Sequence, residues 1–128
     1  MGTVYIPLYV GGPKGERLAL ALVDTGAERT IVSKKLGKEI GLRGKEEELI
    51  TTASGHNIKM KVTKARFRSD RLRIKGHLGV CLSDVPFEVE PEEGIEIIVG
   101  VDFLQKFNLG IRFHGSRALW SHTLGLKT

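Results

Sequence analysis

Apolar and turn-forming positions at the start of the chain predict a β-hairpin. Residues 5–10 are strand formers at nearly every position, and the glycine-rich run 11–15 that follows is typical of a turn. Residues 18–23 are all apolar, which indicates a strand buried on both faces rather than a surface strand. That strand leads directly into Asp24, so the pattern predicts a carboxylate at the end of a rigid element.

Further strand patterns follow, separated by turn residues. Ser54-Gly55 interrupts one pair of predicted strands and Ser69-Asp70 another, which indicates long hairpins in the middle third of the chain. Pro86 and Pro91 bracket an acidic connection, after which an apolar strand ends at Gly100. The predicted strands beyond the first hairpin are residues 48–53, 57–67, 71–82, 95–99, 109–113 and 117–120.

Two short segments carry helix signals. Ser33 can cap a helix in which Leu36 and Ile40 share one face, and Gly41 stands at the usual stopping position. Asp102 is predicted to be the N-cap of a second short helix over residues 103–107. The sequence thus predicts one mostly β domain over residues 1–128 with one or two short helices.

Length and composition are those of an ordinary globular domain. A chain of 128 residues with 41% hydrophobic residues supports one modest core. The longest apolar stretch is too short to cross a bilayer, and the first residues lack the basic start of a secretory signal, so we predict a cytoplasmic protein without a membrane partner. Cys81, the single cysteine, is interpreted as a buried, inert thiol. The three Asn and Gln residues, beside many Glu and Lys, hint at a thermophilic source.

The net charge of +5 is unevenly placed along the chain. Eight cations lie between Lys59 and Lys75 with a single acid, Asp70, whereas glutamates cluster before and after this run. Lys64 and the cations that alternate with it would share one strand face, as in some nucleic-acid-binding proteins. Since only Phe67 adds a ring for base stacking, we prefer a solvated, ion-paired face over a nucleic-acid site.

The run Asp24-Thr25-Gly26-Ala27 is the strongest candidate for chemistry. Its carboxylate follows a strand, its glycine allows another backbone to approach closely, and its threonine hydroxyl can hydrogen-bond to a neighbouring loop. Alone, the run also fits an Asp-Thr-Gly turn at a strand end. Other segments must decide between the two interpretations.

Two segments together resemble the retropepsin-like (retroviral-type) aspartic protease family. Residues 5–32 are similar to that family's opening hairpin, catalytic strand and following strand. The second family hallmark is two apolar residues and a glycine before a short helix, and Ile98-Val99-Gly100 resembles it. Both motifs occur in the family's order, and the resemblance covers about residues 4–113. It implies an all-β fold, a closed barrel in which Asp24 and Gly100 lie close together.

The resemblance also implies roles for individual residues. Asp24 would be the catalytic residue, Thr25 would lock the active-site loops of two subunits together, and Gly26 would offer its backbone to bound peptide, with Ala27 completing the loop. Apolar residues would wall the side-chain pockets, and the exposed tip of a mobile hairpin would close over the substrate. The implied substrate-binding residues are Ile31, Ser54, Gly55, His56, Ile98, Val99 and Gly100.

Two features depart from the family pattern. The family pairs an acidic residue, here Glu28, with an arginine directly after the later glycine, where this chain has Val101. We therefore expect that ion pair to be absent or replaced, with Arg29 and Arg112 as candidate replacements. The segment from about 115 to 128 exceeds the minimal pattern, and the sequence assigns it no role.

A single Asp-Thr-Gly triplet implies a pair of chains. Peptide hydrolysis of this kind needs two carboxyls around one water, and Asp70, Asp84 and Asp102 each have a structural explanation in a turn or at a helix start. A two-fold homodimer that brings Asp24 to face its own copy supplies the pair without a metal or cofactor. We therefore predict an aspartic endopeptidase that acts on polypeptides.

Two alternatives stay open. The same fold could serve as a catalytically silent, dimeric peptide-binding module, although the intact triplet favours activity because a scaffold has no need of the carboxylate. The basic hairpin of residues 59–75 could instead bind nucleic acid, in which case affinity would fall steeply with salt.

Overall fold

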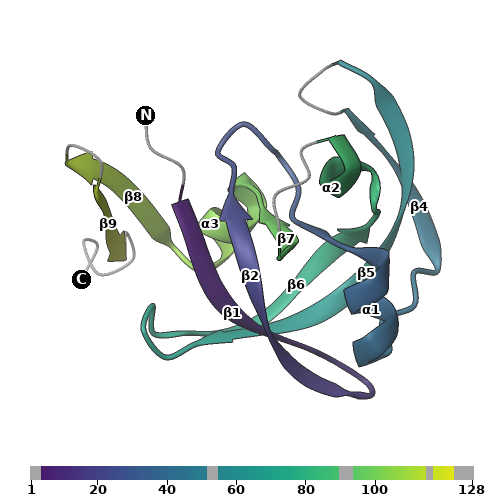
Figure 1. Cartoon of the computed structure of the whole chain (residues 1–128), viewed down its shortest axis with the longest axis horizontal. Coiled ribbons are helices and arrows are strands. Elements are labelled where there is room, and N and C mark those ends of the chain that lie inside the picture. The colour runs from purple at the N-terminus through teal and green to yellow at the C-terminus, as the bar shows by residue number, and fades with distance from the viewer. Residues whose placement is uncertain (1–3, 52–54, 90–93, 115–116, 123–128) are drawn as a thin grey trace.

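The computed structural model describes residues 4–51, 55–89, 94–114 and 117–122 (Figure 1). Within these residues the chain forms nine strands and three short helices, so the prediction of a mostly β architecture is confirmed. In chain order the elements are β1 (Val4–Gly12), β2 (Gly15–Val23), β3 (Ile31–Val32), α1 (Lys34–Ile40), β4 (Glu46–Thr51), β5 (Asn57–Ser69), β6 (Ile74–Leu82), α2 (Val85–Val89), β7 (Ile95–Val99), α3 (Val101–Lys106), β8 (Leu109–His114) and β9 (Arg117–His122).

Seven strands form one sheet that closes on itself. Their order is β1-β2-β7-β3-β6-β5-β4, and an additional pairing joins β1 to β5. The long strand β5 pairs with two different strands along its length. Its first half pairs with β4, and its second half pairs with β1, where Phe67 lies opposite Val10. The sheet is therefore a closed barrel, as the resemblance implied, with β4 as an extension outside the ring.

The last predicted hairpin is also confirmed. Strands β8 and β9 pair antiparallel as a separate two-stranded sheet, in which Ile111 lies opposite Trp120. Both side chains pack against the main core. Gly115, the predicted turn, lies outside the described residues.

Strand β2, which ends directly before Asp24, lies between two other strands of the sheet. It pairs antiparallel with β1 and parallel with β7, so neighbouring strands cover both of its edges. Ala19 and Ala21 are buried, but Leu20 on the other face is only half-buried and Leu18 is 51% exposed. The prediction of burial on both faces is therefore wrong for the outer face. In a closed barrel the inner face packs on the core, and the described residues place no second layer outside β2.

The core fills the interior of the barrel and reaches α3. Phe67 of β5 and Phe103 of α3 are both fully buried, and their rings meet edge to face with centroids 5.2 Å apart. Phe107 packs on Phe103 with a centroid distance of 4.7 Å. These contacts fix the short helix that follows Gly100 against the sheet.

The two expected helices form, but only the first begins as predicted. The Ser33 hydroxyl accepts a hydrogen bond from the Leu36 N–H at 3.2 Å, and Gly41 ends α1 with φ of 82°. Helix α3 instead has Gly100 as its N-cap, with no side-chain cap hydrogen bond. Asp102 lies inside the first turn, because its carboxylate is engaged by residues of another loop, described below.

Local backbone geometry shifts two other predicted boundaries. Arg73 has φ of 54°, so the turn after Ser69 extends further than expected and β6 begins at Ile74 rather than at residue 71. A helix that the sequence did not predict, α2, begins one residue before Pro86. Pro86 is its second residue, where the missing N–H breaks no helical hydrogen bond. Pro91 lies outside the described residues. Among the described elements, no helix has both the length and the apolar character needed to cross a membrane.

Candidate active site

The loop after β2 is tied to the end of β7 by main-chain hydrogen bonds. The Asp24 N–H donates to the Val99 carbonyl at 2.9 Å, and the Val101 N–H donates to the Ala27 carbonyl at 2.8 Å. The two sequence motifs thus lie against each other, and the prediction that Asp24 and Gly100 are close is confirmed. Parallel pairing of β2 with β7 brings both strand ends to the same edge of the sheet.

Gly100 lies where no side chain can be accommodated. A Cβ atom at this position would come within 2.7 Å of the Arg29 main chain and 2.8 Å of the Ala27 carbonyl oxygen. Contacts this short with backbone atoms cannot be relieved by turning a side chain. The glycine of the second motif is therefore required by the close crossing of the two loops.

Asp24 itself is partly exposed and held by its own loop. Its Oδ1 accepts a hydrogen bond from the Gly26 N–H at 2.9 Å, and its carbonyl accepts one from the Ala27 N–H at 3.0 Å. Thr25 and Gly26 are exposed, so the tip of the loop faces the surface of the single chain. The carboxylate is therefore positioned at the end of a strand and open to a second molecule.

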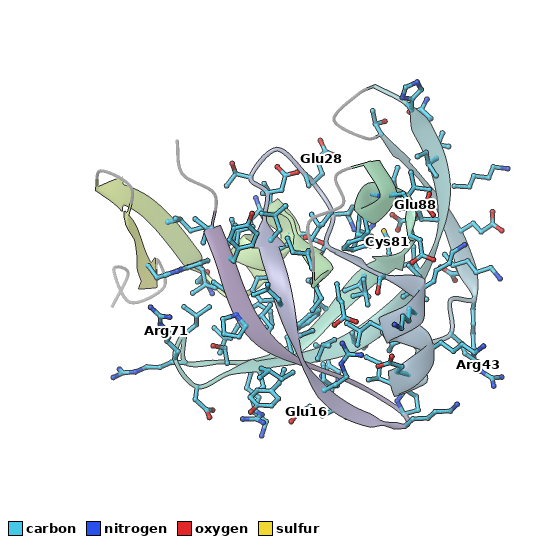
Figure 2. All side chains as sticks on the ribbon, viewed as in Figure 1. Glu16, Glu28, Arg43, Arg71, Cys81 and Glu88 are labelled. Carbon is cyan, nitrogen blue, oxygen red and sulfur yellow. The ribbon has the colours of Figure 1, made fainter. Side chains whose placement is uncertain are left out.

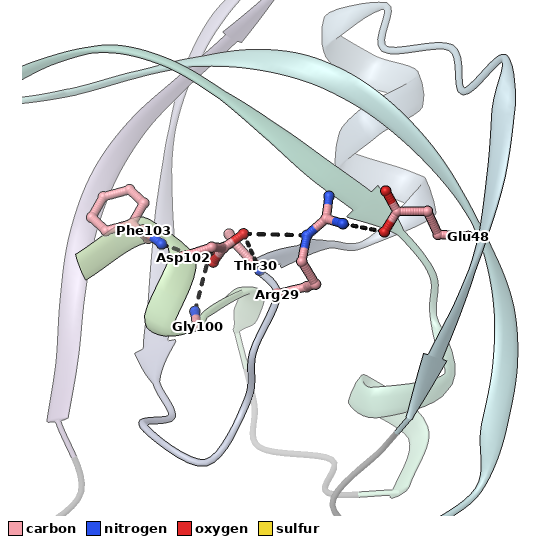
Figure 3. Close-up of polar contacts among 6 residues, drawn as sticks. All are labelled: Arg29, Thr30, Glu48, Gly100, Asp102 and Phe103. Carbon is pink, nitrogen blue, oxygen red and sulfur yellow. Dashed lines mark hydrogen bonds and ion pairs between the residues drawn. The ribbon is translucent and has the colours of Figure 1, made fainter. Parts of the chain in front are cut away.

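A buried network beside this loop was not predicted from the sequence (Figure 3). Thr30 is fully buried; its hydroxyl donates to Asp102 Oδ1 at 2.7 Å, and its N–H donates to Asp102 Oδ2 at 3.0 Å. The Gly100 N–H donates to the Thr30 hydroxyl at 3.1 Å, and the Phe103 N–H donates to Asp102 Oδ1 at 2.8 Å. One carboxylate and one hydroxyl thereby join the loop after β2 to the start of α3.

Arg29 extends this network toward the β4–β5 hairpin. Its Nε lies 3.5 Å from Asp102 Oδ2, and its Nη1 pairs with the Glu48 carboxylate on β4 (Figure 3). The arginine that the sequence offered as a replacement cation is thus paired, with Asp102 and Glu48 as its partners in the described chain. Nothing is described of the Arg112 side chain.

Apolar residues form a small cluster next to the loop. Ile31, Cys81 and Ile98 are buried together with Met60 of β5. The partly buried residues packed around them come from the loop, both strands of the β4–β5 hairpin and α2, and they are Ala27, Ile50, Ile58, Val62 and Phe87. Ile31 and Ile98, which the sequence predicts to wall the substrate pockets, lie together because they are directly paired between β3 and β7, and their role in binding stays a prediction.

Val99 lies on the opposite side of β7. Its side chain is fully buried in the main core, whereas that of Ile98 belongs to the small cluster, since successive side chains of a strand point to opposite faces. The structure therefore places Val99 beneath the loop and away from Ile98. Ile98 and Val99 are adjacent in the motif, so the sequence alone could not show which of these two side chains points toward the loop.

The β4–β5 hairpin reaches the same side of the molecule as the loop after β2 (Figure 1). Gly55 is exposed with φ of 85°, and His56 is exposed as well, as predicted for a hairpin tip. Ser54 lies outside the described residues, and the mobility of the tip stays a prediction. On β4, Leu49 is 62% exposed.

Two further side chains behave as the sequence indicated. Cys81 is buried inside the barrel wall (Figure 2), and this burial raises the pKa of its thiol, which suits an inert group rather than a nucleophile. On the basic hairpin, Arg68 donates to Glu16 at 2.8 Å and lies 4.1 Å from the centre of the Tyr9 ring. The hydrogen bond from Arg68 lowers the pKa of Glu16, so this part of the hairpin is the ion-paired face that we preferred.

The closed barrel and the crossing of an Asp-Thr-Gly loop with a glycine-ended strand are the features of the retropepsin-like fold. The chain belongs to the family described as gag-polyprotein putative aspartyl protease, whose model matches residues 14–106, more than half of the sequence. A comparison with curated proteins gives no significant match.

Solved structures share the fold at low sequence identity. The retropepsin-like aspartic protease from Rickettsia conorii has a TM-score of 0.60 and 15% identity, and the match covers 92% of this chain and 80% of that one. The EIAV protease complexed with the inhibitor HBY-793 has a TM-score of 0.57 and 17% identity, and the match covers 80% of this chain and 86% of that one. The retroviral protease-like domain of Ddi1 from Leishmania major has a TM-score of 0.54 and 16% identity, and the match covers 86% of this chain and 81% of that one.

Proposed function

We propose that the protein is an aspartic endopeptidase that acts as a two-fold homodimer on polypeptides. The observation that carries the proposal is the Asp24 loop, which follows strand β2 at the surface and is hydrogen-bonded to the segment around Gly100. Family membership supplies the reaction class. The fold alone would not, because unrelated functions share folds.

The reaction needs two carboxyls around one water. An ionised Asp24 takes a proton from the water as the oxygen attacks the scissile carbonyl, while the protonated Asp24 of the partner subunit hydrogen-bonds the carbonyl oxygen. The Asp24 that accepted the water proton then donates it to the amide nitrogen, and the tetrahedral intermediate collapses as the C–N bond breaks and the amine leaves. Because one carboxyl must be protonated and the other ionised, we expect activity to be highest at mildly acidic pH.

A second chain is the natural source of the second carboxyl. The other aspartates described in the chain are engaged elsewhere: Asp84 accepts the Lys34 N–H at 2.8 Å, and Asp102 binds Thr30. On the basic hairpin, Asp70 Oδ2 lies 3.4 Å from Arg68 Nη1. The exposed Thr25 and Gly26 are available for contact with a symmetric copy of the same loop.

The surroundings of the loop favour extended, largely apolar substrates. Ala27, Ile50 and Ile58 are only partly buried on the small cluster beside the loop and offer apolar surface for substrate side chains. Ile31 and Ile98 lie beneath them. Gly55 and His56 at the hairpin tip would approach the substrate from the other side.

The substitution Asp24→Asn tests the proposal. It should abolish turnover of a denatured protein substrate and preserve folding and dimerisation, because the amide is nearly isosteric and removes a repulsion between like charges. Wild-type activity should be blocked by a transition-state-mimicking aspartic protease inhibitor and unaffected by a chelator. Activity that survives Asp24→Asn, or that a chelator removes, would show the mechanism to be wrong.

The same experiment distinguishes the alternatives. A folded dimer that binds peptide but is inactive at every pH tried would be a silent binding module. Nucleic-acid binding by the basic hairpin is less well supported, because Arg68 pairs with Glu16 and the Arg66 guanidinium donates to the Gly12 carbonyl at 3.3 Å. Location in the cytoplasm stays a prediction from the sequence.

A further inference from the structure

A groove rich in lysine lies apart from the Asp24 loop. It has a volume of about 810 Å³ and is formed by the end of the first hairpin, α1, the segment after α1, the start of β5 and the end of β6. The cations around it are Lys14, Lys34, Lys38, Arg43, Lys59 and Lys61, and the single acid is Glu47. Arg43 projects at the α1 side of the molecule, well away from Glu28 on the active-site loop (Figure 2).

This groove brings six cations together around a single acid, in contrast to the surroundings of three arginines elsewhere in the described chain; other exposed cations, such as Lys35 and Lys64, also lack an ion pair but lie outside the groove. Arg17, Arg29 and Arg68 each form ion pairs with two acids. None of the six groove cations has an ion pair recorded among the described residues, and all six are exposed. Like charges that converge without counter-charge repel one another, and an anionic ligand would relieve that repulsion.

The groove is not uniformly polar. Leu42 and Leu82 are buried in its floor, and Ile58 and Val85 line it as well. A Cβ atom on Gly44 would come within 2.3 Å of the Lys61 Cβ, so the segment after α1 lies directly on β5 at this point. The surface therefore combines an apolar floor with a cationic rim held on well-packed elements.

We propose that this groove binds an extended, acidic polypeptide segment whose apolar side chains alternate with glutamate or aspartate. In an extended peptide, successive side chains point to opposite sides, so apolar groups can face the floor while carboxylates reach the lysines. Nucleic acid fits less well, because the lining holds no aromatic residue for base stacking and only one arginine. The groove shares Ile58 with the apolar cluster beside the Asp24 loop but does not include Asp24, and the proposal does not depend on catalysis.

Binding can be measured without turnover on the Asp24→Asn protein. The probe is a short fluorescein-labelled peptide of alternating glutamate and leucine, followed by fluorescence anisotropy. We expect saturable binding that weakens as salt rises, and no comparable binding of the same peptide with glutamine in place of glutamate. Equal binding of the glutamine peptide would overturn the charge-based part of the proposal.

Matched lysine pairs locate the site. Lys38→Gln combined with Lys61→Gln removes two charges from the groove and keeps the side-chain stems, and should weaken binding at least about tenfold. Lys35→Gln combined with Lys64→Gln removes two exposed lysines from the same helix and strand outside the groove, and should change binding less than about twofold. Circular dichroism of both proteins checks that they fold.

Three outcomes would overturn the proposal. The first is the absence of saturable binding of the acidic peptide to the folded protein. The second is an equal loss of affinity in the two lysine pairs, which would indicate a general charge effect. The third is tighter binding of a single-stranded DNA of equal charge, which would assign the groove to nucleic acid.

Discussion

Thr30 and Asp102 show how two buried polar side chains can connect loops far apart in the sequence. The Thr30 hydroxyl receives a hydrogen bond from Gly100 and donates one to Asp102, so it joins both motifs of the active-site region. Sequence patterns miss this pairing because its partners are 72 residues apart and a buried threonine carries no periodic signal.

The substitution Thr30→Val tests that connection. It keeps the shape of the side chain but leaves the Gly100 N–H without its acceptor and Asp102 without one donor, which should lower the free energy of unfolding by about 1–3 kcal/mol. Chemical denaturation measures the change. Thr51→Val is the control. The Thr51 hydroxyl hydrogen-bonds to Asn57 at an exposed position, so its loss should change the free energy of unfolding by less than about 0.5 kcal/mol. Equal effects at the two sites would contradict the network.

A second prediction at the scale of single residues concerns the effect of a side chain at Gly100 on stability. Gly100→Ala forces a methyl group to within 2.7 Å of the Arg29 main chain, and should destabilise the protein by about 1–3 kcal/mol through displacement of the loop. Gly79→Ala is the control, because the nearest atom to its Cβ is 3.9 Å away. Thermal unfolding of both proteins checks this, and a Gly100→Ala protein as stable as Gly79→Ala would show that the loops can part.

At the scale of elements, the ion pair of Arg29 with Glu48 links the Asp24 loop to β4. Strand β4 is the edge of the sheet among the described residues and pairs on its inner side with β5. Edge strands open more readily than enclosed ones. The arginine therefore supplies a second attachment for the base of the hairpin.

Arg29→Met should loosen this hairpin while keeping the apolar stem of the side chain. We expect faster hydrogen exchange at the amides of β4, with the exchange of β1 and β2 unchanged. Arg17→Met is the matched control, because Arg17 pairs with Glu39 and Glu96 at another part of the surface. Unchanged exchange in β4, or equal changes in both variants, would mean that the Arg29 pair does not hold the hairpin.

The elements were largely predictable, and the exceptions have local causes. Alternating and apolar runs marked the strands, and Ser33 and Gly41 marked the ends of α1, because these signals lie within the element itself. Helix α2 has five residues, too few to show a helical period. The N-cap of α3 was misassigned because Asp102 binds Thr30 across the loops, and a capping rule considers only neighbouring residues.

At the scale of the whole molecule, the barrel depends on contacts that no short pattern contains. The β1–β5 pairing closes the sheet between residues far apart in the chain; the closed barrel was expected only from resemblance to a family, and this pairing itself was not predicted. The crossing of the Asp24 and Gly100 segments was likewise expected only from that resemblance. The lysine groove assembles residues from several elements, so charge counting along the chain did not reveal it.

The proposed catalytic site consists of two Asp24 carboxylates, one from each of two chains. It can be tested by mixing wild-type and Asp24→Asn chains, with refolding to allow exchange of subunits. If both carboxylates are required, activity falls as the square of the wild-type fraction, so each wild-type chain becomes less active as the variant is added. Activity that falls only in proportion to the wild-type fraction would show that one chain suffices, and would contradict the shared site.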